Sequence, residues 1–268
     1  MKKILAYLTF VLLIFAQSAS ASDIKFVQVT DTHYSKGNEY SKKVLKAAVK
    51  DINTIDGISF VVFTGDNLNR PNEEDLVQFT NIVNKLKVPY YIVIGNHDVF
   101  KSNGLSKERY LEIIKENNFL FKQRKPDYYF RKGDFGFIIA DGAKEIIPGA
   151  NGYFKESTLK FVDKQLTKHK NLKIVIFQHF PLIEPFESKS HSTYKADEYK
   201  SLLNKHSNVI AVISGHYHTN SEKMQDGIYH ISSPSLLQLP HQYKLIDINI
   251  TKGFSPMIYT QLREVTVE

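Results

Sequence analysis

One stretch near residue 90 joins an apolar strand to a group of polar residues. It reads YYIVIGNHD over residues 90–98. The apolar, β-branched run 90–94 is typical of a buried β-strand, and Gly95 allows the sharp turn that a chain makes on leaving one. The polar segment 96–98 follows at once. This stretch therefore predicts a buried sheet with polar side chains at the carboxyl end of one strand.

Four further strand-like runs end in polar residues of the same kinds. They are 24–30 before Asp31-Thr32-His33, 59–64 before Gly65-Asp66-Asn67, 173–177 before Gln178-His179-Phe180-Pro181, and 209–213 before Ser214-Gly215-His216-Tyr217-His218. Any one of these ends, taken alone, is equally typical of an ordinary turn. Ligands of open α/β sheets bind at the carboxyl ends of the strands, so together the five ends predict one edge that carries Asp, Asn and His. These residue types are nitrogen and oxygen donors suited to a metal ion.

The rest of the chain shows both helical and strand-like patterns. Helical spacing occurs at 41–52, 74–86, 156–168 and 197–205, and further strand-like runs occur at 128–131, 135–140, 228–232, 243–250 and 256–260. The alternation of strand and helix in the first half predicts parallel strands, and the closely spaced later strands predict antiparallel hairpins. We expect one α/β domain over residues 22–268, built as a sandwich of two mixed sheets with helices outside.

The first 21 residues have the features of a secretory signal peptide. Lys2 and Lys3 precede an apolar run at 4–16, and Ala19-Ser20-Ala21 is a small-x-small cleavage pattern. The apolar run is shorter than the roughly 18 residues expected of a transmembrane helix. We therefore expect residues 1–21 to be removed and the protein to be exported to the periplasm or the extracellular space, with no stable membrane anchor. An uncleaved N-terminal anchor is the alternative.

The composition of the chain narrows the chemistry. The chain has 268 residues, of which 42% are apolar and 24% charged, with ten His and no Cys. Without Cys there are no disulfides, thiol nucleophiles or iron–sulfur clusters, so any metal must be held by nitrogen and oxygen donors. The net charge is +7, but the lysines are spread along the whole chain. We expect a solvated basic surface and no dedicated nucleic-acid-binding segment.

The five strand ends, read in order, form the series D-x-H, G-D, G-N-H-D, H-x-P and G-H-x-H within residues 24–218. This series resembles the calcineurin-like metallophosphoesterase superfamily, and within it most resembles the class III cyclic-nucleotide phosphodiesterases. The resemblance implies a four-layer α/β/β/α sandwich with a dinuclear metal centre. It also implies a reaction in which a hydroxide bridging two metal ions attacks a small phosphate-ester substrate, with a phosphodiester favoured.

The resemblance also assigns a role to each polar residue. Asp31, His33 and His218 would hold one metal, Asn96, His179 and His216 would hold the other, and Asp66 would bridge both. Donors of this kind, without thiolate, suit Fe, Mn, Zn or Co as divalent or trivalent ions. His97 would be the catalytic residue that protonates the leaving group or orients the phosphate, and Asp98 would fix the tautomer of its ring. Asp98 as a simple turn residue is the alternative.

Two other functions stay open at this point. A phosphomonoesterase would use the same site, and a non-catalytic binding protein would keep the same fold. A purple acid phosphatase is disfavoured, because that group of the superfamily places Tyr three residues after the bridging Asp, where this chain has Asn69.

Several polar residues near the motifs have less definite roles. His191 and His241 could reach a substrate, and Asn67 and Arg70 could contact its phosphate. Asp141 follows a strand and is expected to have a structural or supporting role. Three further histidines are expected to be background, with His230 packed in a strand and the remaining two facing solvent, namely His169 and His206.

Overall fold

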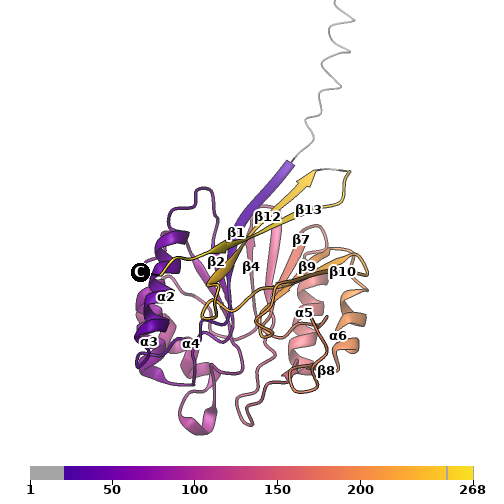
Figure 1. Ribbon diagram of the computed structural model, residues 1–268. Helices are drawn as coiled ribbons and strands as arrows, with labels where there is room; N and C mark the ends of the chain where they lie inside the picture. Colours follow the sequence, from indigo (N-terminus) through magenta and orange to yellow (C-terminus); the bar gives the residue numbers. More distant parts are fainter. Residues whose placement is uncertain (1–20, 252, 268) are drawn as a thin grey trace, which may run out of the picture.

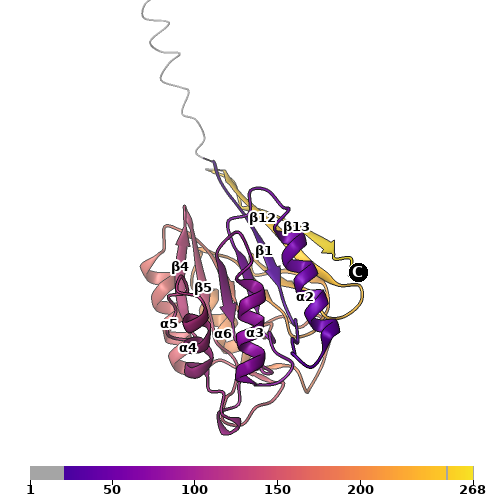
Figure 2. The ribbon, with the colours of Figure 1, turned by 90° about the vertical axis from the view of Figure 1, so that its left-hand side faces the viewer.

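Two β-sheets lie face to face at the centre of the computed structural model, which describes residues 21–251 and 253–267 (Figure 1). The outer face of one sheet is covered by helices α2 (Glu39–Ile52), α3 (Glu73–Val83) and α4 (Lys107–Asn117). The outer face of the other is covered by α5 (Glu156–Lys168) and α6 (Ala196–Leu203). Figures 1 and 2 show these helices on the two outsides of the sheets. The architecture is the predicted four-layer α/β/β/α sandwich.

The first sheet has the strand order β13-β12-β1-β2-β3. Its strands are β1 (Ala21–Val29), β2 (Val61–Thr64), β3 (Tyr90–Val93), β12 (Gln242–Thr251) and β13 (Met257–Glu264). β1, β2 and β3 are parallel, whereas β12 and β13 form an antiparallel hairpin on the other side of β1. The predicted combination of parallel early strands and antiparallel late strands is confirmed.

The second sheet has the strand order β10-β11-β9-β7-β5-β4. Its strands are β4 (Tyr128–Lys132), β5 (Phe135–Ile139), β7 (Lys173–Phe177), β9 (Val209–Ser214), β10 (Ser221–Gln225) and β11 (Ile228–Ser232). The four central strands are parallel and the two edge strands are antiparallel to their neighbours. A separate parallel pair, β6 (Gly152–Tyr153) and β8 (Thr193–Tyr194), joins two loops at the edge where β5 and β7 end.

Aromatic side chains fill the space between the two sheets. Phe26 of β1 stacks on Phe60 with ring centroids 4.9 Å apart, and it meets Phe137 of β5 and Phe177 of β7 edge-on. Neighbouring residues of β1 point the other way, toward the helices, so the strand is buried on both faces. A strand buried on both faces reads as a continuous apolar run, which is why the sequence predicts these strands well.

Helix α4 and strand β10 are not among the elements that the sequence predicts. In α4 the buried residues Tyr110, Leu111, Ile113 and Ile114 are set among charged ones, so the apolar stripe is narrow. β10 has the sequence SEKMQ and is largely exposed. Both depend on neighbours, because α4 packs against α3 and β10 pairs with β11. β13 also continues to Glu264, four residues beyond the predicted end.

The predicted leader lies outside the described residues, except for its last residue. β1 begins at Ala21, where Ala21 pairs with Thr251 of β12. Within the described residues, no helix is long and apolar enough to cross a membrane.

Candidate metal centre

Five strand ends meet at one edge of the sandwich, and the backbone there is strained. Among the described residues, the non-glycine residues with positive φ are Asp31, His33, Asp66, Lys195, His216, His218 and Asp226. Five of these seven are metal ligands implied by the resemblance. Such a conformation is uncommon for non-glycine residues and costs of order 1–3 kcal/mol, and it clusters at functional sites. The backbone is therefore bent where it must aim these side chains.

The strained residues bring their side chains into two adjacent groups. In the first, His218 Nε2 lies 3.2 Å from Asp31 Oδ1 and 3.1 Å from His33 Nε2. In the second, His179 Nε2 lies 3.3 Å from Asp66 Oδ2, and a donor atom of His216 lies within 4.8 Å of both side chains. Donor atoms of Asp66, His33 and His97 also lie within 4.8 Å of one another. Because Asp66 is thus close to His33 of the first group and to His179 of the second, its carboxylate lies between the two groups.

Four donor atoms of this cluster are buried and have no hydrogen-bond partner among the described residues. They are Asp31 Oδ1, Asn96 Oδ1, His179 Nε2 and His216 Nε2. Each buried polar atom without a hydrogen-bond partner destabilises the folded protein by roughly 1–3 kcal/mol. Four such atoms at one place therefore indicate that a ligand binds there. A cation accepts lone pairs from oxygen and imidazole nitrogen alike. The residues present therefore fit a metal centre, and Asn96, the seventh expected ligand, points an unpaired oxygen as a ligand would.

The opposite atoms of the same side chains are held by ordinary hydrogen bonds. Asp31 Oδ2 accepts from Thr30 Oγ1 at 2.6 Å and from the His216 amide at 3.0 Å. His179 Nδ1 donates to the Thr64 carbonyl at 2.8 Å, which leaves Nε2 as the bare nitrogen. The Gln238 side-chain amide lies 2.8 Å from His218 Nδ1. Contacts of this kind orient metal-binding side chains before the metal arrives.

Two glycines allow the strand ends to approach each other closely. A Cβ on Gly95 would collide with the carboxylate and backbone of Asp66, and a Cβ on Gly215 would collide with Thr30 and Asp31. The glycines that the sequence shows before the polar residues are thus required by contact between neighbouring strand ends rather than by turn geometry alone.

The charges in the cluster are strongly coupled. Burial raises the pKa of Asp66, but the charge of the nearby His179 ring outweighs burial and holds that pKa below its usual range. Burial lowers the pKa of His179, but Asp66 raises it to about 9. Burial together with the charge of His179 lowers the pKa of His216 to about 3, so its ring is neutral at neutral pH. Ionised carboxylate and neutral imidazole are the forms that bind metals, so a cation that binds here would take the place of the proton on His179.

His97 lies beside His33 of the first group, and Asp98 makes its hydrogen bonds elsewhere. The His97 ring is exposed, lies 4.9 Å from the His33 ring and donates from Nδ1 to the Asn69 carbonyl at 2.9 Å. Asp98 is fully buried and accepts hydrogen bonds from the Gly95 amide at 2.7 Å and the Leu68 amide at 2.9 Å. The expected tautomer-fixing contact is therefore wrong: a backbone carbonyl supplies it, and Asp98 holds the loop.

Two other sequence-based suggestions are settled by burial. Asn67 is fully buried, and its amide donates to the Val93 carbonyl at 3.0 Å and lies 3.1 Å from the Tyr110 hydroxyl, so it is a structural residue. His241 is buried between the Tyr40 hydroxyl at 2.7 Å and the Leu236 carbonyl at 2.9 Å. Arg70 is exposed, and its contact with phosphate stays a prediction.

His191 lies closer to the centre than its place in the sequence indicates. Its exposed ring lies 5.1 Å from the ring of His216. Phe186, from the same loop, meets Tyr217 edge-on at 5.0 Å, and sequence reasoning missed it. His191 agrees with the expectation that it could reach a substrate, whereas Phe186 belongs to no motif and the long loop between β7 and β8 shows no pattern that would have revealed it.

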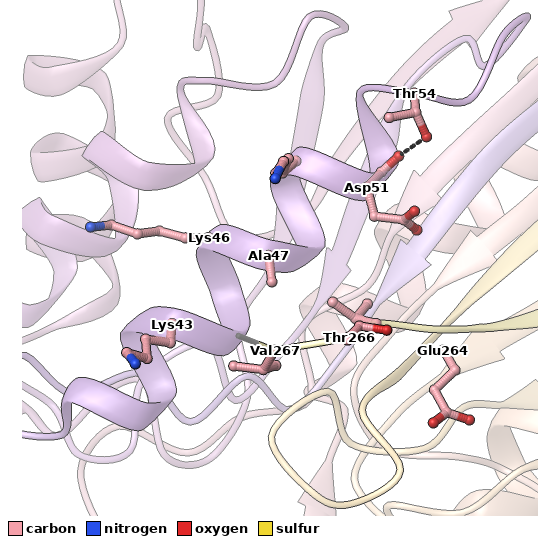
Figure 3. A pocket seen from close by; sticks show the side chains of 10 residues that line it. Lys43, Lys46, Ala47, Asp51, Thr54, Glu264, Thr266 and Val267 are labelled. Carbon is pink, nitrogen blue, oxygen red and sulfur yellow. Dashed lines mark hydrogen bonds between the residues drawn. The ribbon is translucent and has the colours of Figure 1, made fainter.

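A pocket of about 440 Å³ elsewhere on the molecule is a poor alternative site. It lies between α2 and the segment after β13, and its lining includes three exposed lysines, Asp51, Glu264 and Val267 (Figure 3). Asp51 is already used, because it accepts hydrogen bonds from Arg263 at 3.0 Å and from Tyr243. The pocket offers no convergent set of unpaired atoms within the described residues.

Comparison with known proteins identifies a family and relatives. A family model described as "Calcineurin-like phosphoesterase" matches residues 24–220. The chain is 29% identical over 219 residues to a probable glycerophosphodiester phosphodiesterase, GpdQ, of Arcobacter nitrofigilis, covering 78% of this chain and 77% of the relative. It is 24% identical over 209 residues to a probable cyclic nucleotide phosphodiesterase of Colwellia psychrerythraea, covering 75% and 73%.

Two solved structures share the fold at low sequence identity. A dimetal phosphatase from Danio rerio aligns with a TM-score of 0.64 and 17% identity, covering 88% of this chain and 98% of that one. A putative 5′-nucleotidase from Staphylococcus aureus aligns with a TM-score of 0.59 and 16% identity, covering 91% of this chain and 54% of that one.

Proposed function

The chain belongs to the calcineurin-like phosphoesterase family, and from that premise we propose that it is an exported phosphodiesterase with a two-metal centre. As a member of the family it is a metal-dependent hydrolase of phosphate esters. The two ions, the preference for a diester and the export are the proposed parts.

The two-metal centre is supported by the convergence of unpaired donor atoms from both sheets. Asp31, Asn96, His179 and His216 each aim a buried atom without a hydrogen-bond partner at the same edge. The donors fall into two groups with the Asp66 carboxylate between them. A carboxylate has two oxygens, so Asp66 is the group suited to bridge two ions.

The residues of the site would have different roles in hydrolysis. Metal ions bound here would supply Lewis acidity for the phosphoryl group and an activated water as nucleophile. Neutral imidazoles leave the pair with net positive charge, which favours an anionic substrate. His97 lies at the rim with its Nδ1 fixed by the Asn69 carbonyl, so its Nε2 is the atom that meets a leaving-group oxygen.

The preference for a diester rests on the relatives. Curated relatives of this chain carry the names of probable glycerophosphodiester and cyclic nucleotide phosphodiesterases. Export rests on the leader pattern in residues 1–21. N-terminal sequencing of the secreted protein tests it: a start at Ser22 is expected, and a start at Met1 would overturn it.

A substrate panel with metal analysis tests the proposal. The protein is stripped with EDTA, reloaded with Mn²⁺, and assayed on bis-p-nitrophenyl phosphate, p-nitrophenyl phosphate and cyclic nucleotides. We expect two ions per chain and a kcat/KM for the diester at least about tenfold above that for the monoester, or about 1.4 kcal/mol in transition-state stabilisation. A monoester preference would overturn the diester assignment. A protein without bound metal and without activity would be a non-catalytic member of the fold.

A further inference from the structure

A chain of aromatic rings runs from the metal centre to the surface. The His216 ring contacts the His191 ring at 5.1 Å and the Tyr217 ring at 5.6 Å. The Tyr217 ring contacts the Phe186 ring at 5.0 Å in an edge-on geometry. Tyr217 is buried, whereas 55% of Phe186 is exposed and His191 is exposed. We call Phe186, Tyr217 and His191 the aromatic shelf.

The shelf is held in place on both sides of Phe186 and His191. On one side, Lys223 Nζ from β10 donates to the Glu184 carbonyl at 2.8 Å and to the Pro185 carbonyl at 3.3 Å. On the other side, the amide of Asn151 donates to the Lys189 carbonyl at 3.1 Å. Contacts to a second loop and a second strand thus fix the segment that carries the two exposed rings. A site that is fixed before binding loses less entropy when its ligand arrives.

Position and exposure together indicate what the shelf can bind. Its inner end lies against the ring of His216. A substrate whose organic group lies on the shelf would therefore have its phosphate group beside the metal ligands. Its outer end is the exposed ring of Phe186, which is neither packed in the core nor charged. An aromatic face stacks on planar rings, and it gives little to a flexible aliphatic alcohol such as glycerol.

We propose that the aromatic shelf is the subsite for the organic group of the substrate and that this group is planar, as in an ester of a nucleoside. This inference rests on the proposed function, because it places the phosphate at the metal centre. It separates two substrate classes among the relatives: the shelf favours a nucleotide over a glycerophosphodiester. Phe186 is then a specificity-determining residue that contacts the substrate away from the reacting atoms.

Two diesters with the same leaving group test this proposal. One is the p-nitrophenyl ester of thymidine 5′-monophosphate, and the other is methyl p-nitrophenyl phosphate. Both release p-nitrophenol, so their chemical steps are matched and they differ in the group that would lie on the shelf. Stacking of a base on an aromatic side chain typically changes affinity roughly tenfold or more, so we expect the thymidine ester to have a KM about tenfold lower in the metal-loaded wild type.

Three variants of Phe186 and one control locate the effect. Phe186→Ala and Phe186→Leu should each raise the KM for the thymidine ester about tenfold and leave kcat and the KM for the methyl ester within about twofold. Phe186→Tyr should restore the wild-type KM because it keeps the ring. Phe119→Ala removes another exposed ring, 81% accessible and far from the motifs in the sequence, and should change neither KM. The rate on the methyl ester reports that each variant is folded.

The outcomes distinguish this inference from the function on which it rests. If wild type hydrolyses both esters with similar KM, or if Phe186→Ala and Phe186→Leu affect both esters alike, the shelf is not the subsite, but the phosphodiesterase assignment stands. If metal-loaded wild type hydrolyses neither ester, the proposed function is wrong and the inference is wrong with it.

Discussion

Two clusters of buried charged residues lie at the same edge of the sandwich, and they differ in how their polar atoms are paired. In the metal centre, four buried donor atoms converge without hydrogen-bond partners among the described residues. In the second cluster, Lys107 pairs with Asp141, Lys107 Nζ also donates to the Ala143 carbonyl at 2.6 Å, and Asp127 accepts from the Asp141 amide and the Thr158 hydroxyl. We call this second group the Lys107 cluster.

The comparison shows how a binding site differs from a structural ion pair. Asp66 and Asp141 both follow a buried strand and both are almost fully buried. In the Lys107 cluster the cation that pairs with Asp141 is a lysine of the protein itself. In the metal centre the protein supplies only donors, and the balancing cation must come from outside. Unpaired atoms that converge, rather than buried charge alone, therefore mark the site.

Removing one charged group should have opposite effects in the two clusters, and the largest effect is expected in the metal centre. Asp66→Asn should lower kcat/KM on bis-p-nitrophenyl phosphate by about 10³-fold or more, because one amide oxygen cannot bridge two ions and several kcal/mol of transition-state stabilisation are lost. The amide oxygen still accepts from the His97 amide, so in EDTA at about pH 10, where the His179 ring is neutral in wild type and variant alike, the unfolding free energy should change by less than about 1 kcal/mol. Urea denaturation in EDTA and steady-state assays measure the two effects.

Adding Mn²⁺ provides the control for this variant. Metal that binds only the folded state stabilises it, by about 2.7 kcal/mol at 100 times the dissociation constant. Wild type should therefore gain stability with Mn²⁺, and Asp66→Asn should gain much less. Near-normal hydrolysis by Asp66→Asn would remove Asp66 from the centre.

The Lys107 cluster should show the reverse pattern. Lys107→Met leaves Asp141 buried without its cation, which typically destabilises a protein by about 3–5 kcal/mol. We expect a loss of about 3 kcal/mol in unfolding free energy, with kcat/KM per folded molecule within about threefold of wild type. The double variant Lys107→Met/Asp141→Leu should recover much of the loss, since it removes both charges. Equal damage to activity and stability would show that the cluster supports catalysis directly.

The sequence predicts the fold and the donor set for a physical reason. Strands buried on both faces, such as 173–177 and 228–232, read as apolar runs and are found at their true bounds. The polar residues after them are exceptional in such surroundings, so they stand out. α4 and β10 have no such contrast, because their residues are mixed or exposed and their neighbours decide their structure.

The contacts of individual side chains are harder to predict. Asp98 is adjacent to His97 in sequence, which suggests a contact, but adjacent side chains at a turn point in different directions. Phe186 and His191 reach the centre through a long loop whose path depends on Lys223 and Asn151. Nothing local in the loop specifies those partners.

The buried ring of His230 has an unpaired nitrogen that stands alone, unlike the unpaired atoms of the metal centre. His230 Nδ1 is buried without a hydrogen-bond partner, but His230 belongs to none of the groups of candidate metal ligands among the described residues. Burial, with a small contribution from the charge of Lys200, lowers the pKa of His230 to about 4. A lowered histidine pKa means that the folded state favours the neutral ring. Its stabilising contribution is present above pH 6.5 and is lost as the pH falls from about 6.5 through 4.

His230→Gln should therefore reduce the loss of unfolding free energy that wild type shows as the pH falls. Between pH 7 and pH 4, wild type in EDTA should lose about 2 kcal/mol more unfolding free energy than the variant, after allowance for partial solvent screening of the shift. Metal-loaded activity at pH 7 should be unchanged within about twofold, because His230 does not join the donor groups. An equal pH dependence in both proteins would show that the ring is hydrated in the folded state.

Asp98 gives the smallest effect and tests whether a buried carboxylate next to the site belongs to it. Asp98→Asn keeps one acceptor for the Gly95 or Leu68 amide and loses the other, so we expect a loss of about 1 kcal/mol in unfolding free energy. Its kcat should fall by much less than that of His97→Ala, for which a lost proton donor predicts about 100-fold. If Asp98 instead oriented His97, the two single variants would match and the double variant would be no worse than either. The Asn69 carbonyl bond to His97 Nδ1 argues against that result, because it fixes the ring without any help from Asp98.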